Sequence, residues 1–128
     1  MMMRVFIVDD ASFIRILCRH YVQKAGYEVC GESYDGAHAL EEIRKTQPDC
    51  VIMDLTLPSL NGVEIMRKIN AEYSHIRFIV VSSLDKNFCG TELEKVQYQD
   101  FLTKPFEPED LKKALDYAAQ HMEKLNHG

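Results

Sequence analysis

The fold is decided by the stretch VIMDLTLPSLNG, residues Val51–Gly62. Its first three residues are apolar without alternation, which is typical of a strand that is covered on both faces. Pro58, and Asn61 followed by a glycine, supply the turn chemistry that ends the run. The pattern therefore predicts a buried strand that carries Asp54 at its tip, at the mouth of a sheet.

The composition is that of an ordinary globular domain. The chain has 128 residues, which suits one domain spanning residues 1–128 with a single core. The net charge of -5 provides no basic surface, so we expect no direct nucleic-acid binding by this domain. The sequence contains no apolar run of membrane length and no signal-peptide pattern, so we expect a cytoplasmic protein without membrane contact.

The cysteines are widely spaced and form no C-x-x-C pair; they are Cys18, Cys30, Cys50 and Cys89. Most lie within apolar patterns, so we expect small buried thiols in a reducing compartment. A redox switch at Cys89 is the alternative, and only the loop position of this residue favours it.

Four further runs are predicted to be strands. Arg4–Val8 is β-branched and aromatic and, like the first stretch, ends in carboxylates, here Asp9 and Asp10. The other expected strands are Tyr27–Ser33, Arg77–Val81 and Gln99–Thr103. Tyr27–Ser33 is the least apolar, which favours a place near an edge of the sheet.

Helical spacing of apolar residues separates these strands. It predicts helices over Ala11–Ala25, from Asp35 to the stop at Pro48, from Asn61 to Tyr73, over Leu84–Gln97, and from Pro108 to Leu125. In the third helix we expect Val63, Met66, Ile69 and Tyr73 to face inward. The segment Leu84–Gln97 is the weakest, because Gly90 interrupts it and large apolar residues are few, with Phe88 among them; we expect it to be short or mobile.

Strands that alternate with helices predict an α/β fold: a doubly wound, five-stranded parallel sheet with helices on both faces. In such sheets ligands bind beyond the carboxyl ends of the strands. Parallel strands bring to this edge the residues that end the expected strands, which are Asp9, Asp10, Asp54, Ser82 and Lys104. Each alone could be a cap, a turn residue or a solvated charge, but the five together favour a functional site.

Carboxylates this close together repel one another, and a divalent cation relieves that repulsion. Oxygen ligands with room for water suit Mg²⁺, whereas the histidines show no metal-ligand spacing. A metal, a lysine and a hydroxyl together suit a tetrahedral anion such as a phosphoryl group. Since no glycine-rich phosphate loop is present, the phosphoryl group could be carried covalently on a carboxylate.

At this point the sequence resembles the receiver domain of two-component response regulators, the CheY-like family with a flavodoxin-like (βα)5 fold. The marks are the acidic pair Asp9-Asp10, Asp54 with Leu57-Pro58 and Asn61-Gly62 behind it, Ser82 after an apolar strand, and the motif Phe101-x-x-Lys104-Pro105-Phe106. They span essentially the whole chain.

The resemblance implies a phosphorylation-operated signalling switch that is not an enzyme beyond intrinsic Mg²⁺-dependent phosphotransfer and slow autodephosphorylation. Asp54 would accept a phosphoryl group from the phosphohistidine of a sensor histidine kinase or a phosphotransfer protein. Mg²⁺ would be held by Asp10, Asp54 and the main-chain carbonyl of Thr56, with Asp9 acting through water.

The family also implies how the event is relayed. Lys104 would pair with the new phosphoryl oxygen, and Ser82 would move to hydrogen-bond it while Phe101 swings into the vacated space. A downstream protein would read the fourth helix, fifth strand and fifth helix. Residues two positions after the acceptor and after the hydroxyl, Thr56 and Leu84, would tune the rate of dephosphorylation.

One departure and two alternatives bear on this interpretation. Before Phe101 the family commonly has a small Ala-Gly-Ala-like run, whereas this chain has Val96-Gln97-Tyr98, so we expect a reshaped approach to the last strand. A haloacid-dehalogenase-like phosphatase also uses a strand-tip aspartate with Mg²⁺, but it wants an acid where Thr56 stands. A receiver that is never phosphorylated is the third possibility, and the intact site residues argue against it.

Overall fold

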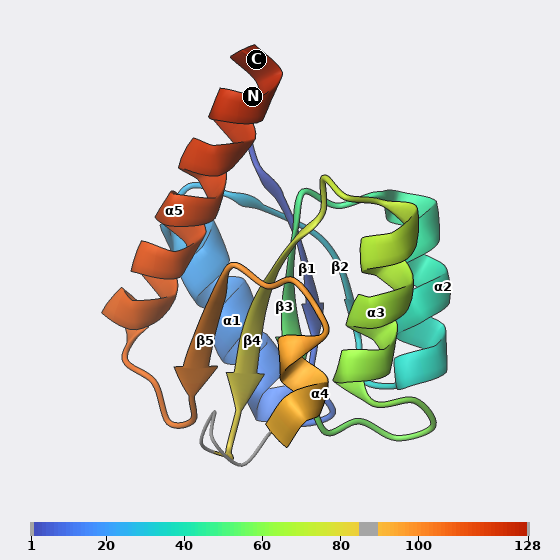
Figure 1. Cartoon of the computed structure of the whole chain (residues 1–128). Coiled ribbons are helices and arrows are strands. Elements are labelled where there is room, and N and C mark those ends of the chain that lie inside the picture. Colours follow the sequence, from blue (N-terminus) through green and yellow to red (C-terminus); the bar gives the residue numbers. More distant parts are fainter. Residues whose placement is uncertain (1, 85–89, 128) are drawn as a thin grey trace.

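The strand that carries Asp54 lies at the centre of a five-stranded parallel sheet, whose order is β2-β1-β3-β4-β5. The structure is a computed structural model that describes residues 2–84 and 90–127 (Figure 1). The strands are β1 (Arg4–Val8), β2 (Glu28–Ser33), β3 (Cys50–Asp54), β4 (Arg77–Ser82) and β5 (Asp100–Thr103). The predicted doubly wound fold is confirmed, and the least apolar strand, β2, lies at an edge.

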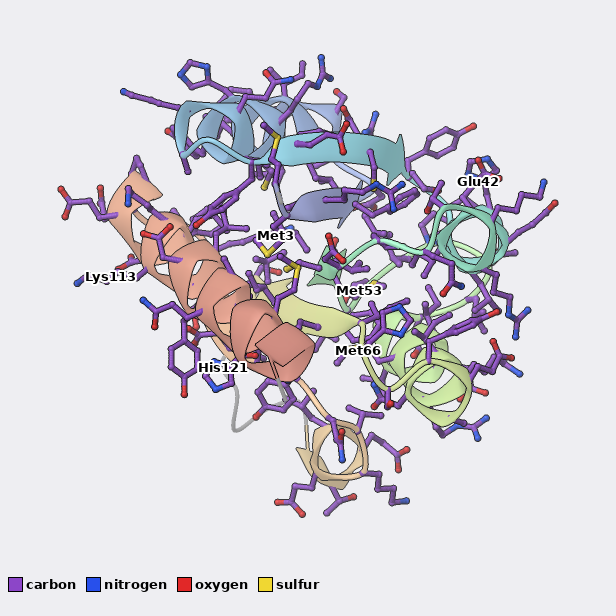
Figure 2. The ribbon with its side chains drawn as sticks, turned by 90° about the horizontal axis from the view of Figure 1, so that it is seen from above. Met3, Glu42, Met53, Met66, Lys113 and His121 are labelled. Carbon is purple, nitrogen blue, oxygen red and sulfur yellow. The ribbon has the colours of Figure 1, made fainter. Side chains whose placement is uncertain are left out.

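Helices cover both faces of this sheet: α1 (Ser12–Lys24), α2 (Gly36–Thr46), α3 (Gly62–Glu72), α4 (Gly90–Glu94) and α5 (Pro108–His127). Residues of α1 and α5 pack with alternate residues of the central strands, such as Ile7 and Ile52. Residues of α2, α3 and α4 pack on the opposite face, against Phe6, Val51 and Phe78. Figure 2 shows the two helical layers on either side of the sheet. The uniform apolarity of β3 follows from this burial on both faces.

The helix boundaries follow the signals in the sequence. Asp35 accepts a hydrogen bond from the His38 main-chain N–H, and Asn61 accepts one from that of Glu64, so both act as N-caps at the helix starts that the sequence predicts. Gly26 follows α1 with φ of 93°, a conformation that glycine adopts without strain. The α4 helix has only 5 residues, in agreement with the weak pattern over this segment.

The four residues predicted to face inward along α3 all contact the core. Met66 and Ile69 are fully buried, and Val63 and Tyr73, the latter just after the helix, are half-buried and pack against the same core. Ile65, which the prediction omitted, is also fully buried. Among the thiols, Cys18 and Cys50 are buried and Cys30 is half-buried; burial raises the pKa of Cys18 and of Cys50 to about 12, so neither is a reactive thiolate. Phe88 and Cys89 lie outside the described residues. Within the described residues, no helix combines the length and apolarity needed to cross a bilayer.

Two glycines, one at the start of α3 and one at the start of α2, form main-chain hydrogen bonds with the loop between β3 and α3. The Gly62 N–H donates to the Leu55 carbonyl (2.8 Å), and the Gly36 N–H donates to the Pro58 carbonyl (3.0 Å). A Cβ on Gly62 would lie 2.8 Å from the Leu55 Cα and would overlap the Asp54 carbonyl oxygen. The close approach of α3 to the tip of β3 therefore depends on the absence of a side chain.

We predict that Gly62→Ala lowers the free energy of unfolding by about 1–3 kcal/mol, because the added methyl group meets main-chain atoms that cannot rotate away. Urea unfolding measures the change. Gln23→Ala on the exposed side of α1 is the control and should stay within about 0.5 kcal/mol of the wild type. Equal stability of Gly62→Ala and wild type would show that the loop is not packed as described.

Candidate functional site

The carboxyl edge of the sheet brings the predicted polar residues together. In the parallel ladders Val8 pairs with Met53 and Asp54 with Val81, so the residues after β1 and at the end of β3 are neighbours. Ser82 pairs with Thr103, which places Lys104 next to the end of β4. The strand register alone thus collects at one edge the side chains of Asp9, Asp10, Asp54, Ser82 and Lys104.

Three carboxylates form the floor of the site. Asp9, Asp10 and Asp54 each offer an oxygen, and these oxygens lie within 4.8 Å of one another. Asp9 and Asp54 are buried at 1% and 5% exposure, whereas Asp10 is exposed. A set of oxygen ligands with one side open to water fits a small hard cation such as Mg²⁺ better than a soft metal. The cluster could therefore hold a metal ion.

Among the described residues, one ammonium group faces these acids. Lys104 Nζ donates to Asp9 Oδ2 at 2.7 Å and lies 3.5 Å from Asp54 Oδ2. Burial alone would lower the pKa of Lys104, but its hydrogen bond to Asp9 and the charge of Asp54 raise it above its ordinary value. Lys104 therefore remains charged, and within the described part of the chain its positive charge is balanced against three carboxylates.

Asp54 is the acid most affected by this environment. Burial, and then the negative charge of Asp9, raise the pKa of Asp54 from 3.8 to about 6. Lys104 and the Thr56 N–H, which donates to Asp54 Oδ1 at 3.2 Å, act in the opposite direction without cancelling the shift. Ionisation of Asp54 thus destabilises the folded protein. A bound cation, or a modification that neutralises the Asp54 carboxylate, would remove this destabilisation.

The Ser82 hydroxyl lies at the next strand tip. It accepts a hydrogen bond from the Leu84 N–H at 3.0 Å and is 2% exposed. A pocket of about 250 Å³ opens beside it, lined in part by Leu55, Asn61 and Leu84. Space for a side-chain rearrangement therefore exists next to Ser82.

Phe101 and Leu84 occupy different positions around this site. Phe101 is half-buried on β5 and packs against the core formed with α2, α3 and α4. Leu84 is 51% exposed, and the Thr56 side chain is also exposed. Leu84 and Thr56 are thus accessible to solvent at the site, whereas Phe101 connects the sheet to the helical face.

The sequence did not point to Arg15, which contacts the main chain of Asp9 in the acidic cluster. Its Nη1 donates to the main-chain carbonyl of Asp9 at 2.7 Å, and its guanidinium lies 5.7 Å from the centre of the Tyr34 ring. The Asp9 carboxylate also accepts a hydrogen bond from the Ala11 N–H at 2.9 Å. Arg15 is one of several charged residues of α1, and nothing in its spacing sets it apart.

Comparison with known proteins points to one family. A model of the response regulator receiver domain matches residues 5–116. A chemotaxis protein CheY of Thermotoga maritima is 38% identical over 113 residues, which cover 88% of this chain and 94% of that protein. A CheY-like receiver domain protein from Methanospirillum hungatei superposes with a TM-score of 0.89 at 22% identity, over 97% of this chain and 98% of that one. The receiver domain of AraT from Geobacillus stearothermophilus gives 0.86 at 26% identity, over 98% and 99%.

We predict that Asp54→Asn stabilises the metal-free protein at neutral pH. The folded-state pKa of Asp54, about 6, lies above its ordinary value of 3.8, so the folded state binds more protons than the unfolded state between these values. The penalty is full above about pH 6 and fades as pH falls towards 4. The gain from Asn should be roughly 2–3 kcal/mol at pH 7.5 and should shrink with acidification, as measured by urea unfolding in chelator.

The control for this prediction is Asp116→Asn. Partial burial opposes ionisation of Asp116, but Lys112 and Tyr27 lower its pKa overall, so its removal should destabilise the protein. Mg²⁺ should stabilise the wild type and reduce the advantage of Asp54→Asn, because binding to the folded state alone adds stability by mass action. A gain from Asn that is independent of pH and of Mg²⁺ would contradict this account of the cluster.

Proposed function

The chain belongs to the response regulator receiver domain family, and from this premise we propose that Asp54 accepts a phosphoryl group from the phosphohistidine of a sensor histidine kinase or phosphotransfer protein. The observation that supports this most is the position of Asp54 at the tip of the central strand, with two further acids, Lys104 and Ser82 around it. The chain then acts as a signalling switch and catalyses only its own phosphotransfer and slow dephosphorylation.

The step is a displacement at phosphorus. An Asp54 oxygen forms the new P–O bond, the P–N bond to the donor imidazole breaks, and the imidazole retains the electron pair and takes up a proton. Asp10, Asp54 and the main-chain carbonyl of Thr56 would hold Mg²⁺, with Asp9 acting through water. The ion would neutralise charge on the phosphoryl oxygens, and positioning supplies most of the remaining rate.

Two side chains of the site can respond to the new group. Lys104 Nζ lies 3.5 Å from Asp54 Oδ2, so a small movement away from Asp9 would bring it to a phosphoryl oxygen. The Ser82 hydroxyl accepts from Leu84 and can donate its own proton to the same group. Both contacts are charge-assisted hydrogen bonds to an anion, which are stronger than neutral ones.

We propose that the response reaches a downstream protein through α4, β5 and α5. Movement of Ser82 would open space for Phe101, which packs on the core beside Leu93 and Val96. The short α4 offers little local stability, as expected of an element that rearranges. On α5, Tyr117 is 49% exposed and could contact such a partner.

We predict that acetyl phosphate with Mg²⁺ labels the wild type once and that Asp54→Asn abolishes labelling, as measured by intact mass spectrometry. Asp116→Asn, a carboxylate far along α5, is the control and should be labelled normally. Chelation of Mg²⁺ should also block labelling, since uncompensated carboxylates repel the incoming phosphoryl anion. Full labelling of Asp54→Asn would refute Asp54 as the acceptor, and an unlabelled wild type would favour a receiver that is never phosphorylated.

A further prediction concerns the lifetime of phospho-Asp54. Leu84 offers no hydrogen bond that could orient an attacking water, whereas a carboxylate there could hold water in line. Leu84→Glu should therefore accelerate decay by about tenfold, equivalent to about 1.4 kcal/mol in the barrier. Leu84→Met is the control of similar volume and should decay like the wild type. Slower or equal decay in Leu84→Glu would show that Leu84 does not shield the acyl phosphate.

A further inference from the structure

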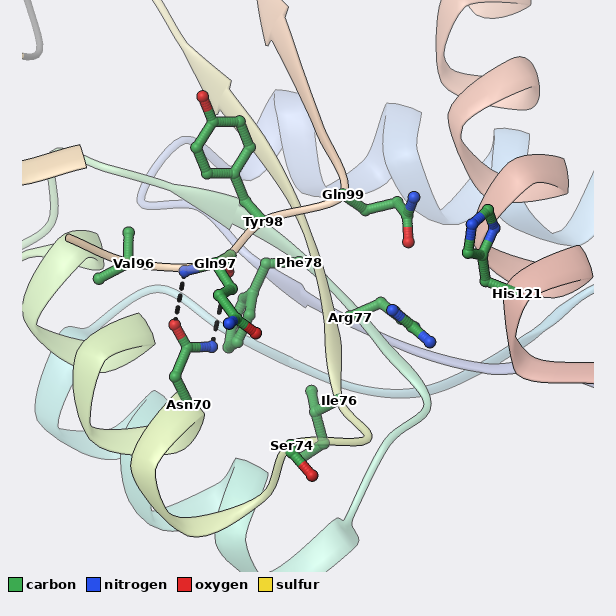
Figure 3. Close-up of a pocket in the computed structure, with 10 residues that line it drawn as sticks. All are labelled: Asn70, Ser74, Ile76, Arg77, Phe78, Val96, Gln97, Tyr98, Gln99 and His121. Carbon is green, nitrogen blue, oxygen red and sulfur yellow. Dashed lines mark hydrogen bonds between the residues drawn. The ribbon is translucent and has the colours of Figure 1, made fainter. Parts of the chain in front are cut away.

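A second polar pocket lies at the amino edge of the sheet, at the opposite end of β4 from Ser82. It has a volume of about 420 Å³, within the range of about 300–1,000 Å³ that small-molecule sites occupy. Its walls come from the end of α3, the start of β4, the connection from α4 to β5, and α5 (Figure 3). It shares no residue with the acidic site.

Arg77, the first residue of β4, lines this pocket and is electrostatically unusual. Every other arginine of the described chain forms an ion pair with a glutamate: Arg4 with Glu28, Arg15 and Arg19 with Glu32, Arg44 with Glu72, and Arg67 with Glu64. Arg77 forms none with the described residues, and its Nε is buried without a hydrogen-bond partner. A buried donor of a charged group without an acceptor is costly, so such a group calls for a partner.

Other polar side chains line the same pocket as Arg77. Figure 3 shows the Arg77 side chain extending from β4 towards His121, with Gln99 just before the start of β5. The side-chain amides of Gln97 and Gln99 have no hydrogen-bond partner among the described residues. His121 Nδ1 lies 3.0 Å from the Tyr117 carbonyl oxygen, which leaves Nε2 of this ring for another contact.

On another side of the pocket, hydrogen bonds between Asn70 and Gln97 form the wall. Asn70 Oδ1 accepts from the Gln97 N–H at 2.8 Å, and Asn70 Nδ2 donates to the Gln97 carbonyl at 3.5 Å (Figure 3). This pair fixes the connection to β5 against α3. Ile76, Phe78 and Val96 add an apolar surface that could support the organic body of a ligand.

We propose that this pocket binds a small organic anion, whose carboxylate or phosphomonoester group pairs with the Arg77 guanidinium. The planar fork of arginine matches both acidic groups. The amides of Gln97 and Gln99 line the same pocket and offer further donors to a bound ligand. The apolar surface takes the uncharged part of the molecule. The site is separate from Asp54 and does not depend on the phosphorylation proposed above.

The test compares charged and neutral members of matched ligand pairs at constant ionic strength. AMP against adenosine examines a phosphomonoester, and 4-hydroxybenzoate against 4-hydroxybenzamide examines a carboxylate. Binding is followed by NMR chemical shifts of the Gln97 and Gln99 amides. We expect at least one anion to bind with a Kd below about 1 mM and at least tenfold more tightly than its neutral partner.

Arg77→Met, which keeps the length of the side chain and removes its charge, should weaken this binding at least tenfold. Arg67→Met, outside the pocket, is the control and should bind like the wild type. Without ligand, Arg77→Met should melt at the same temperature as the wild type or higher, because it removes an unpaired buried donor. If Arg77→Met does not fold, Arg77→Lys, which keeps the charge but lacks the planar fork, should bind the anion more weakly than the wild type does.

Three results would overturn the proposal: no anion of either pair binds the wild type, the neutral partners bind as tightly as the anions, or Arg77→Met binds the anion unchanged. Labelling of Asp54 by acetyl phosphate should proceed in Arg77→Met as in the wild type. Failure of the anion site would thus leave the phosphorylation proposal standing, and the reverse also holds.

Discussion

The balance of charge at the carboxyl edge of the sheet is the constraint on which the site depends. Of the residues that the structure describes, three carboxylates with oxygens within 4.8 Å of one another face one ammonium, that of Lys104. Two unit charges at such a separation interact by about 4 kcal/mol at an effective dielectric near 20. The folded protein tolerates this repulsion because Lys104 is held between Asp9 and Asp54. Any event that adds a cation or removes the charge of Asp54 shifts that balance.

The fold fixes the geometry of this balance through main-chain contacts. Parallel pairing of β1 with β3 places Asp9 beside Asp54, and pairing of β4 with β5 places Ser82 beside Lys104. Glycines at positions 36 and 62 let α2 and the loop after β3 approach more closely than any side chain would permit. The β4 strand runs from Arg77, which lines the pocket at the amino edge of the sheet, to Ser82, which lies in the acidic site at the carboxyl edge.

Most of the fold and of the acidic site could be predicted from the sequence, because the signals for strands, helix starts and strand ends lie in neighbouring residues. Apolar runs without alternation predicted the central strands, and side-chain caps at Asp35 and Asn61 predicted two helix starts. The polar residues of the site were found because each directly follows or ends a strand. What the sequence could not show depends on the three-dimensional surroundings of single side chains: the contact of Arg15 with the Asp9 carbonyl, and the lack of a hydrogen-bond partner for Arg77 Nε among the described residues. Similarly, periodicity alone could not distinguish the buried Ile65 from the half-buried Val63, because both lie on the inward side of α3.

We expect a phosphoryl group on Asp54 to draw Lys104 away from Asp9 and to engage Ser82. A crystal structure of the protein with Mg²⁺ and beryllofluoride, a phosphoryl analogue, would show this movement. We expect the analogue on an Asp54 oxygen, with Lys104 Nζ and Ser82 Oγ both within hydrogen-bonding distance of its fluorines. A structure in which Lys104 stays on Asp9 Oδ2 and Asp54 carries no analogue would contradict the account.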